Sequence, residues 1–171
     1  MERTQQIYRT KDPDVVLRFA REEDIPTLLR LIRGLAEYEK MENDVAATEE
    51  TLRDSLFRQK SAEAVLAELR GEPVGYALFF HNFSTFLGRS GLYLEDIFVE
   101  PGCRRRGIGG ALLSFLARLA VGRGCGRMEW TCLNWNKPSA DFYRAMGAKP
   151  QEQWTIFRLD GEALPELAEK F

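Results

Sequence analysis

A run of arginines and glycines has the composition of a site for an anion. It reads Arg104-Arg105-Arg106-Gly107-Ile108-Gly109-Gly110 and lies between a strand-like stretch, residues 92–99, and a helix-like stretch, residues 111–121. Glycines have no Cβ, so they permit tight turns and close approach of a ligand to the backbone. The helix directs its free amides and the positive end of its dipole at the same place, and arginines fork onto phosphate oxygens. The pattern predicts a phosphate or pyrophosphate cradle, with a solvated basic turn as the alternative.

The elements that must position this run follow from the hydrophobic periodicity. Strands are expected at residues 15–20, 64–69, 74–80, 92–99, 128–133 and 155–159. Helices are expected from a cap at Asp24 to about residue 40, from a cap at Thr48 through residue 57, and at residues 111–121, 138–146 and 162–170. Residues 81–91 are expected to form a loop. The order of these elements predicts an α/β (α+β mixed) domain whose mixed sheet has helices on both faces.

Length and composition indicate one domain. The chain has 171 residues, of which 44% are hydrophobic, and this is enough for a substantial core. Residues 1–13 are expected to be a polar N-terminal arm and residues 14–171 a single domain. The formal net charge is −2, from 24 Lys and Arg against 26 Asp and Glu, so we expect no nucleic-acid partner, because such proteins usually have a basic surface.

The sparse cysteines and histidine argue against a metal site. Cys103, Cys125 and Cys132 form no CxxC pair, and His81 is the single histidine, so no zinc set of the usual spacing can be drawn. We expect reduced thiols and no metal. No apolar stretch approaches the roughly 20 residues that span a membrane, and the N-terminal residues lack the apolar core of a signal peptide. A cytoplasmic protein without membrane contact is expected.

Two segments resemble the GNAT acetyltransferases. The spacing Arg104-x-x-Gly107-x-Gly109 between a strand and a helix is similar to that family's acyl-CoA pyrophosphate loop. The segment from Asn134 to Ala148 matches the family pattern Asn-x-x-(Ser/Ala)-x-x-Phe-Tyr-x-x-x-Gly-(Ala/Phe). Both occur in the family's order and at about its spacing. The resemblance implies the GNAT fold, with a central mixed, largely antiparallel sheet, and acetyl-CoA as co-substrate.

Three further segments resemble the spermidine/spermine N-acetyltransferase branch of this family, which includes thialysine-acetylating relatives. They are residues 29–42, 93–99 and 154–160. Within that branch a glycine usually occupies the position of Arg105. The resemblance implies transfer of an acetyl group to a small cationic primary amine, such as a polyamine, a diamine or a thialysine-like amino acid, and it implies a homodimer. A protein or peptide N-acetyltransferase and a catalytically weak acyl-CoA-binding sensor are the alternatives.

The resemblance also assigns the donor site. Backbone groups of Ile97, Phe98 and Val99 would pair with the pantetheine arm of acetyl-CoA, like a strand that accepts another strand at its edge. The pyrophosphate would be held by Arg104, Arg105, Arg106, Gly107, Ile108, Gly109 and Gly110, and the cofactor would then pass Asn136, Lys137, Pro138 and Ser139.

Two residues are candidates for the catalytic steps. Transfer from a thioester to an amine expels a thiolate, which the phenol of Tyr143 could protonate; a half-buried core tyrosine is the alternative. The amine must itself lose a proton before it attacks. Glu95 and Asp96 are adjacent on a strand, so they should point to opposite faces, and the family resemblance favours Glu95 as the base. An ion-pair partner for an arginine is the alternative role of Glu95.

An acidic and aromatic set is expected to bind the acceptor. By resemblance it comprises Tyr38, Glu39, Glu95, Asp96, Glu129, Trp130, Thr131 and Trp154. Negative charge there would attract a cationic amine, and an aromatic ring could face the cation; a solvated helix end and a core tryptophan are the alternatives. Cys132 is interpreted as a packing residue rather than an acyl-carrying thiol. This favours direct transfer in a ternary complex over a ping-pong route.

Overall fold

A computed structural model describes residues 6–171 of the chain. The first five residues of the expected arm lie outside the described residues. The chain divides into two compact units between Thr131 and Cys132, and each unit is described by itself below.

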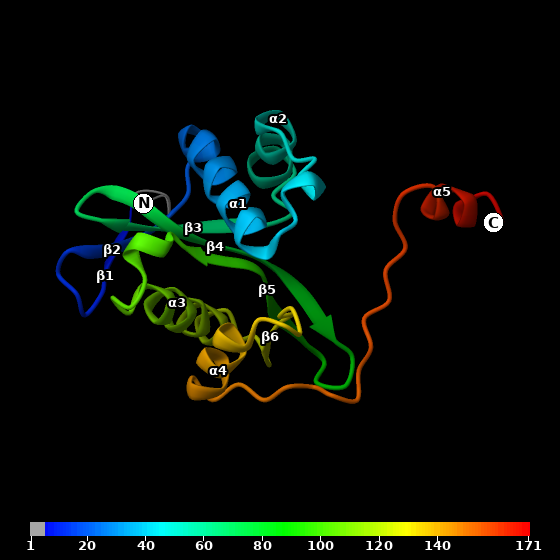
Figure 1. Cartoon of the computed structure of the whole chain (residues 1–171). Coiled ribbons are helices and arrows are strands. Elements are labelled where there is room, and N and C mark those ends of the chain that lie inside the picture. The colour runs from blue at the N-terminus through cyan, green and yellow to red at the C-terminus, as the bar shows by residue number, and fades with distance from the viewer. Residues whose placement is uncertain (1–5) are drawn as a thin grey trace. The chain divides into compact units, whose positions relative to one another are not determined.

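The first unit contains a sheet of six strands (Figure 1). In the order in which they lie, the strands are β1 (Ile7–Arg9), β2 (Val15–Phe19), β3 (Glu63–Leu69), β4 (Glu72–Ser84), β5 (Arg89–Val99) and β6 (Met128–Trp130). Neighbouring strands from β1 to β5 are antiparallel, and β6 is parallel to β5. The expected mixed, largely antiparallel sheet is therefore confirmed. The arm itself contains β1, which the sequence analysis did not anticipate.

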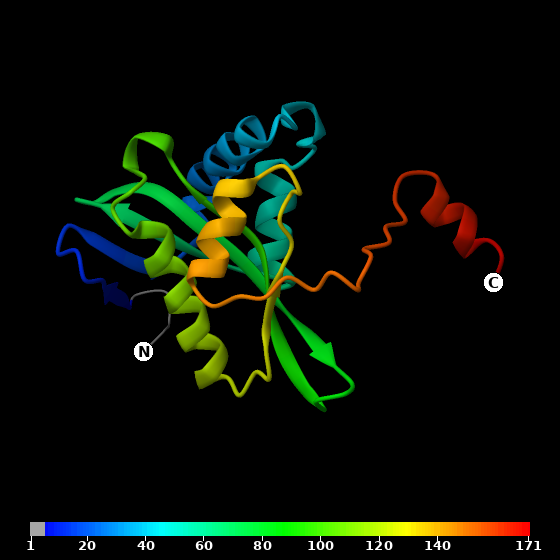
Figure 2. The same ribbon diagram turned by 60° about the horizontal axis from the view of Figure 1, so that its bottom comes forward.

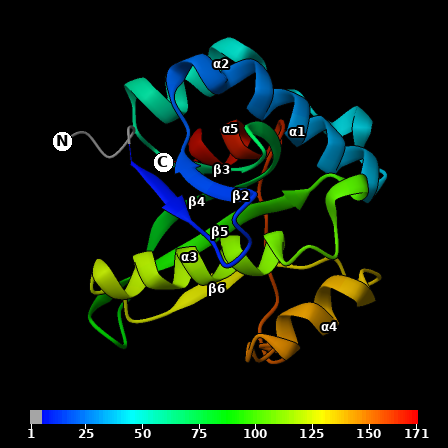
Figure 3. The same ribbon diagram turned by 90° about the vertical axis from the view of Figure 1, so that its left-hand side faces the viewer.

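Helices cover both faces of this sheet, as predicted. One face carries α1 (Ile25–Glu39) and α2 (Glu49–Arg53), and the opposite face carries α3 (Ile108–Gly122) (Figure 3). A single π-helical turn, Asp54–Arg58, continues α2, and short 3₁₀ turns occur at Glu22–Asp24, Glu42–Asp44 and Pro101–Cys103. The hydroxyl of Thr48 accepts a hydrogen bond from the Thr51 amide at 3.2 Å, which confirms the predicted cap.

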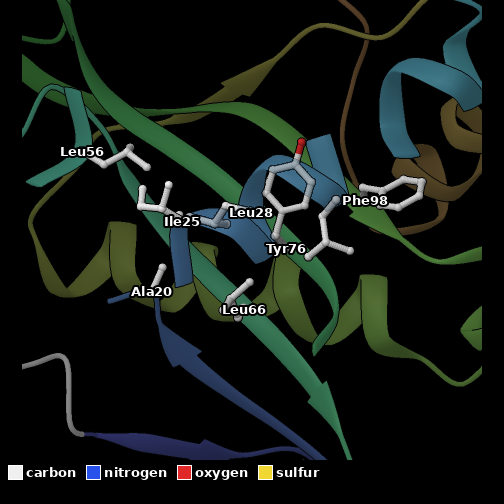
Figure 4. Close-up of a cluster of buried hydrophobic side chains, with 9 residues drawn as sticks. Ala20, Ile25, Leu28, Leu56, Leu66, Tyr76 and Phe98 are labelled. Atoms are coloured by element: carbon white, nitrogen blue, oxygen red, sulfur yellow. The ribbon is translucent and has the colours of Figure 1, made fainter. Parts of the chain in front are cut away.

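The core on the α1 side joins helix to sheet. Its fully or nearly fully buried members are Ala20, Ile25, Leu28, Leu31, Leu56, Ala64, Leu66, Tyr76 and Phe98 (Figure 4). Apolar residues recur at helical spacing along α1, so this stripe is removed from water against β3, β4 and β5. Burying each such side chain contributes about 1.5–3 kcal/mol relative to exposure. The packing fixes the C-terminal end of α1 beside the C-terminal half of β5.

Asp24 has a different role from the expected helix cap. It occupies the N-cap position of α1, yet its carboxylate forms no capping bond to that helix. Its two oxygens instead accept from the Arg18 guanidinium at 2.6 and 2.8 Å, and one also accepts from the Arg21 amide at 2.7 Å. Glu68 binds the same guanidinium at 2.7 Å. The carboxylate therefore joins β2 and β3 to the start of α1.

The expected loop at residues 81–91 is wrong, because β4 and β5 continue through it as one long hairpin. Paired residues run from Phe80 and Tyr93 to Ser84 and Arg89, with Gly88 at a φ of 60° in the turn. Figure 2 shows this hairpin extending beyond the other strands of the sheet. At its tip Phe83 and Phe86 are exposed whereas Ser84 is buried, so the alternation of inward apolar and outward polar residues by which strands are recognised in a sequence is absent there.

The second unit contains two helices, α4 (Lys137–Ala145) and α5 (Ala163–Ala168). Gly147 closes α4 at a φ of 92°, as its sequence position predicts. The strand predicted at residues 155–159 is wrong: these residues have no regular structure and are exposed. Their β-forming side chains are insufficient because this unit contains no strand with which they could pair. No helix of the described residues has the length and apolarity required to cross a membrane.

Candidate active site

The parallel strands β5 and β6 separate where the predicted donor residues begin. Their last paired residues are Leu94 and Trp130, whereas β5 continues to Val99 with β4 on its other side. In an antiparallel ladder, alternate residues direct their N–H and C=O groups to opposite neighbours. Part of the backbone from Asp96 to Val99 therefore faces the side from which β6 has departed. Such an edge suits an extended ligand that carries amide groups.

A β-bulge lies at the start of this open stretch. Asp96 pairs with Leu78, and Leu94 pairs with the next residue of β4, Phe79. Glu95 is thus the extra residue, and the regular alternation that was expected to place Glu95 and Asp96 on opposite faces is interrupted between them. Bulges re-aim side chains and are frequent beside active sites. Here the bulge gives two consecutive carboxyl groups a geometry that a regular strand does not allow.

Three carboxyl groups and one phenol interact at this point. The Tyr76 hydroxyl, on β4, donates a hydrogen bond to Oδ2 of Asp96 at 2.9 Å. Burial raises the pKa of Asp96; the Tyr76 hydrogen bond partly opposes this, and the charge of Glu95 adds to the rise. Burial also raises the pKa of Glu39, at the end of α1, and the charge of Asp96 adds to it. The cluster concentrates negative charge, and Asp96 and Glu39 have lost part of their hydration, whereas Glu95 is exposed.

Tyr76 is a site residue that the sequence analysis missed. Its side chain is fully buried, and its pKa is raised well above 10, first by burial and then by the charge of Asp96. The available signal was a tyrosine within an apolar strand, since a buried phenol needs a hydrogen-bond partner. The sequence did not identify that partner, because the strand register alone brings Asp96 within reach.

The arginine and glycine loop has the backbone of an anion cradle. Arg105 and Gly107 both have left-handed backbones, with φ values of 64° and 76°. The first helical hydrogen bond of α3 joins the Ala111 amide to the Gly107 carbonyl at 2.9 Å, so the three amides before it are the orphan donors of a helix N-terminus. A Cβ built on Gly107 or Gly110 would meet no atom within 4 Å, which leaves the backbone approachable. These features fit a pyrophosphate.

The Arg104 side chain contacts other residues of the protein. Its Nε donates to the Val99 carbonyl at 2.9 Å, and its guanidinium carbon lies 4.5 Å from the centroid of the Tyr38 ring. By the family resemblance, Arg104 was expected on the pyrophosphate and Tyr38 in the acceptor site. The structure brings these two side chains together, so one arginine links the end of β5 to the end of α1.

An open cleft of about 900 Å³ lies between α1 and the turn after β5. Its walls come from α1, including Tyr38, from Glu42 and Val45 after that helix, and from Phe98 and residues 100–102. An ion pair between Arg30 and Glu100 joins the two walls. The cleft is large enough for a small amine or part of a larger ligand.

The remaining expected acceptor residues of the first unit lie on or just after β6. Glu129 is bound by the Asn82 amide at 2.9 Å and by Nε of Arg127 at 2.8 Å, so its charge is already partnered. Trp130 is half-buried and Thr131 is exposed. Tyr93 is the β5 neighbour of Glu129, which places Glu129 before the bulge rather than at the open stretch.

The second unit holds the predicted general acid. Tyr143 is half-buried on α4, with its ring 5.4 Å from that of Phe142. Oδ1 of Asn136 accepts from the Ser139 amide at 3.2 Å and so caps α4; the sequence analysis had assigned both residues to the cofactor. Lys137 and Pro138 are exposed at the start of the helix. Trp154, expected to face a cation, is 76% exposed.

Comparisons with known proteins show which family the chain resembles. The model of the "Acetyltransferase (GNAT) family" matches residues 25–148. Thialysine N-epsilon-acetyltransferase of Bos taurus is 42% identical over 168 residues, which cover 91% of this chain and 98% of that protein. L-ornithine N5-acetyltransferase NATA1 of Arabidopsis thaliana is 30% identical, with 88% of this chain and 86% of that protein covered.

A solved structure extends the agreement to the fold. An integron cassette protein from the mobile metagenome of V. cholerae superimposes with a TM-score of 0.76 at 25% identity, covering 91% of this chain and 98% of that one. The chain belongs to the GNAT acetyltransferase family and is an N-acetyltransferase. The resemblance seen in the sequence, including that to the thialysine-acetylating relatives, is confirmed.

Proposed function

We propose that this protein transfers an acetyl group from acetyl-CoA to a small, positively charged primary amine, by direct attack in a ternary complex. The observation that carries the proposal is the cluster formed by Glu39, Glu95 and Asp96 at the bulge of β5. Thialysine and ornithine, named in two relatives, both have a side-chain amine. A polyamine or diamine has the same chemistry and belongs to the proposed class.

The donor half of the proposal depends on the loop and the strand edge. Bound acetyl-CoA would supply the activated thioester. The amides that begin α3 and the side chains of Arg105 and Arg106 would bind its pyrophosphate, because donors and positive charge converge there. Backbone groups of Ile97 to Val99 would bind its pantetheine amides. Oxyanion stabilisation would also come from backbone donors near this end of β5.

The acceptor half depends on the carboxyl cluster. An alkylammonium ion has no lone pair, so it must lose a proton before it can attack. Burial raises the pKa values of Asp96 and Glu39, and a bound cation would offset the lost hydration of these two carboxylates. We propose Glu95 as the general base, directly or through a water, with Asp96 and Glu39 holding the cationic acceptor.

Direct transfer rather than a ping-pong route is supported by the surroundings of Cys132. Its Sγ lies 3.7 and 3.8 Å from the carbonyl oxygens of Leu133 and Asn136, which is a packing environment. Tyr143 is the proposed acid that protonates the departing thiolate. We also propose a cytoplasmic homodimer, which sedimentation velocity of the purified chain would test.

A thiol-release assay tests the function. Thialysine, ornithine, diamines, polyamines, lysine and short peptides are each supplied with acetyl-CoA at two pH values. Small cationic amines should be acetylated, faster at the higher pH because more free amine is present. Preferential acetylation of peptides would replace the proposal with a protein N-acetyltransferase, and acetyl-CoA binding without any turnover would replace it with a sensor.

Carboxamide variants locate the acceptor. Because a hydrogen bond to a charged group contributes about 1.5–3 kcal/mol, Glu39→Gln and Glu95→Gln should each raise the KM for cationic amines or lower kcat by roughly 10- to 100-fold. Glu72→Gln, at the exposed start of β4, is the matched control and should leave both constants unchanged. Unchanged constants in Glu39→Gln and Glu95→Gln would place the acceptor elsewhere.

A further inference from the structure

The Tyr76 hydroxyl binds Asp96, which is proposed to hold the acceptor amine. Tyr76 lies opposite Phe98 in the β4–β5 ladder, and Leu78, two residues further, lies opposite Asp96. The phenol thus reaches diagonally along the same face of the sheet to Oδ2 of Asp96, at 2.9 Å. Figure 4 shows the Tyr76 ring among the apolar side chains of the core, with its oxygen directed away from Leu66.

We propose that Tyr76 is a positioning residue for the acceptor: its hydroxyl fixes Oδ2 of Asp96 and so leaves Oδ1 to receive the amine. The inference rests on the proposed function, because it concerns the same acceptor site. It adds a residue that does not itself touch the acceptor. The fixed ring of Tyr76, packed on all sides, gives the carboxylate one orientation.

In the hydrogen bond between Tyr76 and Asp96, the phenol is the donor and the carboxylate is the acceptor. Tyr76 is fully buried, and the carboxylate charges beside it keep its hydroxyl protonated, so it acts only as a donor. Asp96 directly follows the bulge and pairs with Leu78. The groups that act on its charge come from each neighbouring element: Tyr76 from β4, Glu95 from β5 and Glu39 from α1.

The hydrogen bond also determines the charge of the site. It favours the ionised form of Asp96, whereas burial and Glu95 favour the protonated form. Without the Tyr76 hydroxyl, Asp96 would hold its proton to a higher pH. It would then lose its negative charge at a higher pH than in the wild-type protein. Tyr76 therefore sets both the orientation of Asp96 and the pH at which it becomes negative.

The test is Tyr76→Phe, which removes the hydroxyl and keeps the ring in place. The KM for cationic amines should rise roughly 10-fold or more, as expected for a lost hydrogen bond to a charged group. The KM for acetyl-CoA should stay unchanged, and the acid limb of the kcat/KM profile should move to higher pH. Tyr8→Phe is the matched control, since its hydroxyl binds only Gln6 in the described structure.

A double-mutant cycle separates positioning from a general structural effect. If Tyr76 acts through Asp96, the double variant Tyr76→Phe/Asp96→Ala should be no worse than Asp96→Ala alone. Additive losses, or equal loss of amine and acetyl-CoA binding, would overturn the inference. A Tyr76→Phe variant with the KM and pH profile of the wild type would also overturn the inference. In that case the proposed function still stands if the wild-type protein acetylates amines.

A further measurement, on the wild-type protein and on Tyr76→Phe, needs no turnover. The ¹³C resonance of the Asp96 carboxyl should shift when ornithine or thialysine is added, and its titration should move to higher pH in Tyr76→Phe. Absence of both changes would overturn the inference. A wild-type protein that acetylates no amine would defeat the proposed function instead, and the titration would still decide whether Tyr76 controls Asp96.

Discussion

The guanidinium carbon of Arg104 lies 4.5 Å from the centroid of the Tyr38 ring. The same side chain donates to the Val99 carbonyl at 2.9 Å and passes the Phe98 ring at 5.8 Å. A cation over an aromatic face contributes about 0.5–1 kcal/mol at an exposed site. Arg104 therefore connects the loop assigned to acetyl-CoA with the end of α1, where Glu39 follows Tyr38.

This contact predicts that Arg104 affects both substrates. Arg104→Lys keeps the charge but loses the planar stacking and the Nε bond, so we expect the KM for the amine to rise by a factor of about 2–5, in line with the strength of an exposed cation–π contact. Steady-state kinetics with each substrate varied in turn measure the effect. Arg106→Lys is the comparison, and it should change only the KM for acetyl-CoA. An Arg104→Lys effect confined to acetyl-CoA would contradict the prediction.

The proposed role of Tyr143 as the acid predicts that removal of its hydroxyl slows the chemical step. Tyr143→Phe keeps the ring against Phe142 but removes the proton that would neutralise the thiolate, so kcat should fall by roughly 10²–10⁴. Phe142→Leu, which alters the neighbouring ring and keeps the phenol, is the control for packing. Full kcat in Tyr143→Phe at every pH would show that the thiolate leaves without its help.

The sequence predicts the elements whose periodicity comes from burial. The strand beginning at Val15 and the helix beginning at Ile25 agree with the structure because their apolar residues face one core. The β4–β5 hairpin was missed beyond Phe80, since its tip exposes Phe83 and Phe86 and buries Ser84. The strand expected at residues 155–159 failed for the converse reason, because β-forming side chains need a neighbouring strand.

The site residues also fall into those that a local sequence pattern predicts and those that it does not. The glycines and arginines of the loop could be interpreted locally, because a cradle is built from consecutive backbone groups. The bulge at Glu95 and the bond from Tyr76 to Asp96 could not, because both depend on how two distant strands align. A shift of one residue in register would separate Tyr76 from Asp96 without altering any local pattern.

The interactions of the Asp24 carboxylate predict that part of the free energy of unfolding depends on pH. Burial alone would raise its pKa, but the hydrogen bonds from Arg18 and the Arg21 amide outweigh this and lower it. A lowered carboxyl pKa contributes stability that is complete above the ordinary value of about 3.9 and is lost as the pH falls through the folded value. Asp24→Ala should lower the free energy of unfolding by about 3 kcal/mol at pH 7, because the largely buried Arg18 guanidinium keeps Glu68 as its one carboxylate partner in the described structure.

Urea unfolding of wild type and Asp24→Ala at pH 7 and below pH 4 measures this contribution. The difference between the two proteins should shrink as the pH falls. Asp12→Ala, in the turn before β2, is the control, since its carboxylate accepts only the Asp14 amide in the described structure. A difference that is independent of pH would assign the effect to packing rather than to charge.

The left-handed backbone of Arg105 predicts that Arg105→Gly stabilises the protein. Its φ of 64° is costly for a residue with a Cβ, by roughly 1–2 kcal/mol, which explains why glycine suits this position in related enzymes. Arg105→Gly relieves that strain but frees the unfolded chain, at a cost of about 0.4–1 kcal/mol. The net gain should be at most about 1.6 kcal/mol, or roughly 3–6 °C in Tm for a protein of this size.

Arg105→Gly also separates backbone from side chain in the binding of acetyl-CoA. The amides of the cradle remain, so the Kd should rise only by a factor of about 2–5, equivalent to less than about 1 kcal/mol. Calorimetric Tm and the Kd for acetyl-CoA are measured together, with Lys60→Gly as control because Lys60 also has a left-handed backbone, at a φ of 55°. That control should gain stability without a change in Kd. A lower Tm in Arg105→Gly would show that the Arg105 side chain, rather than its backbone conformation, determines the stability of the loop.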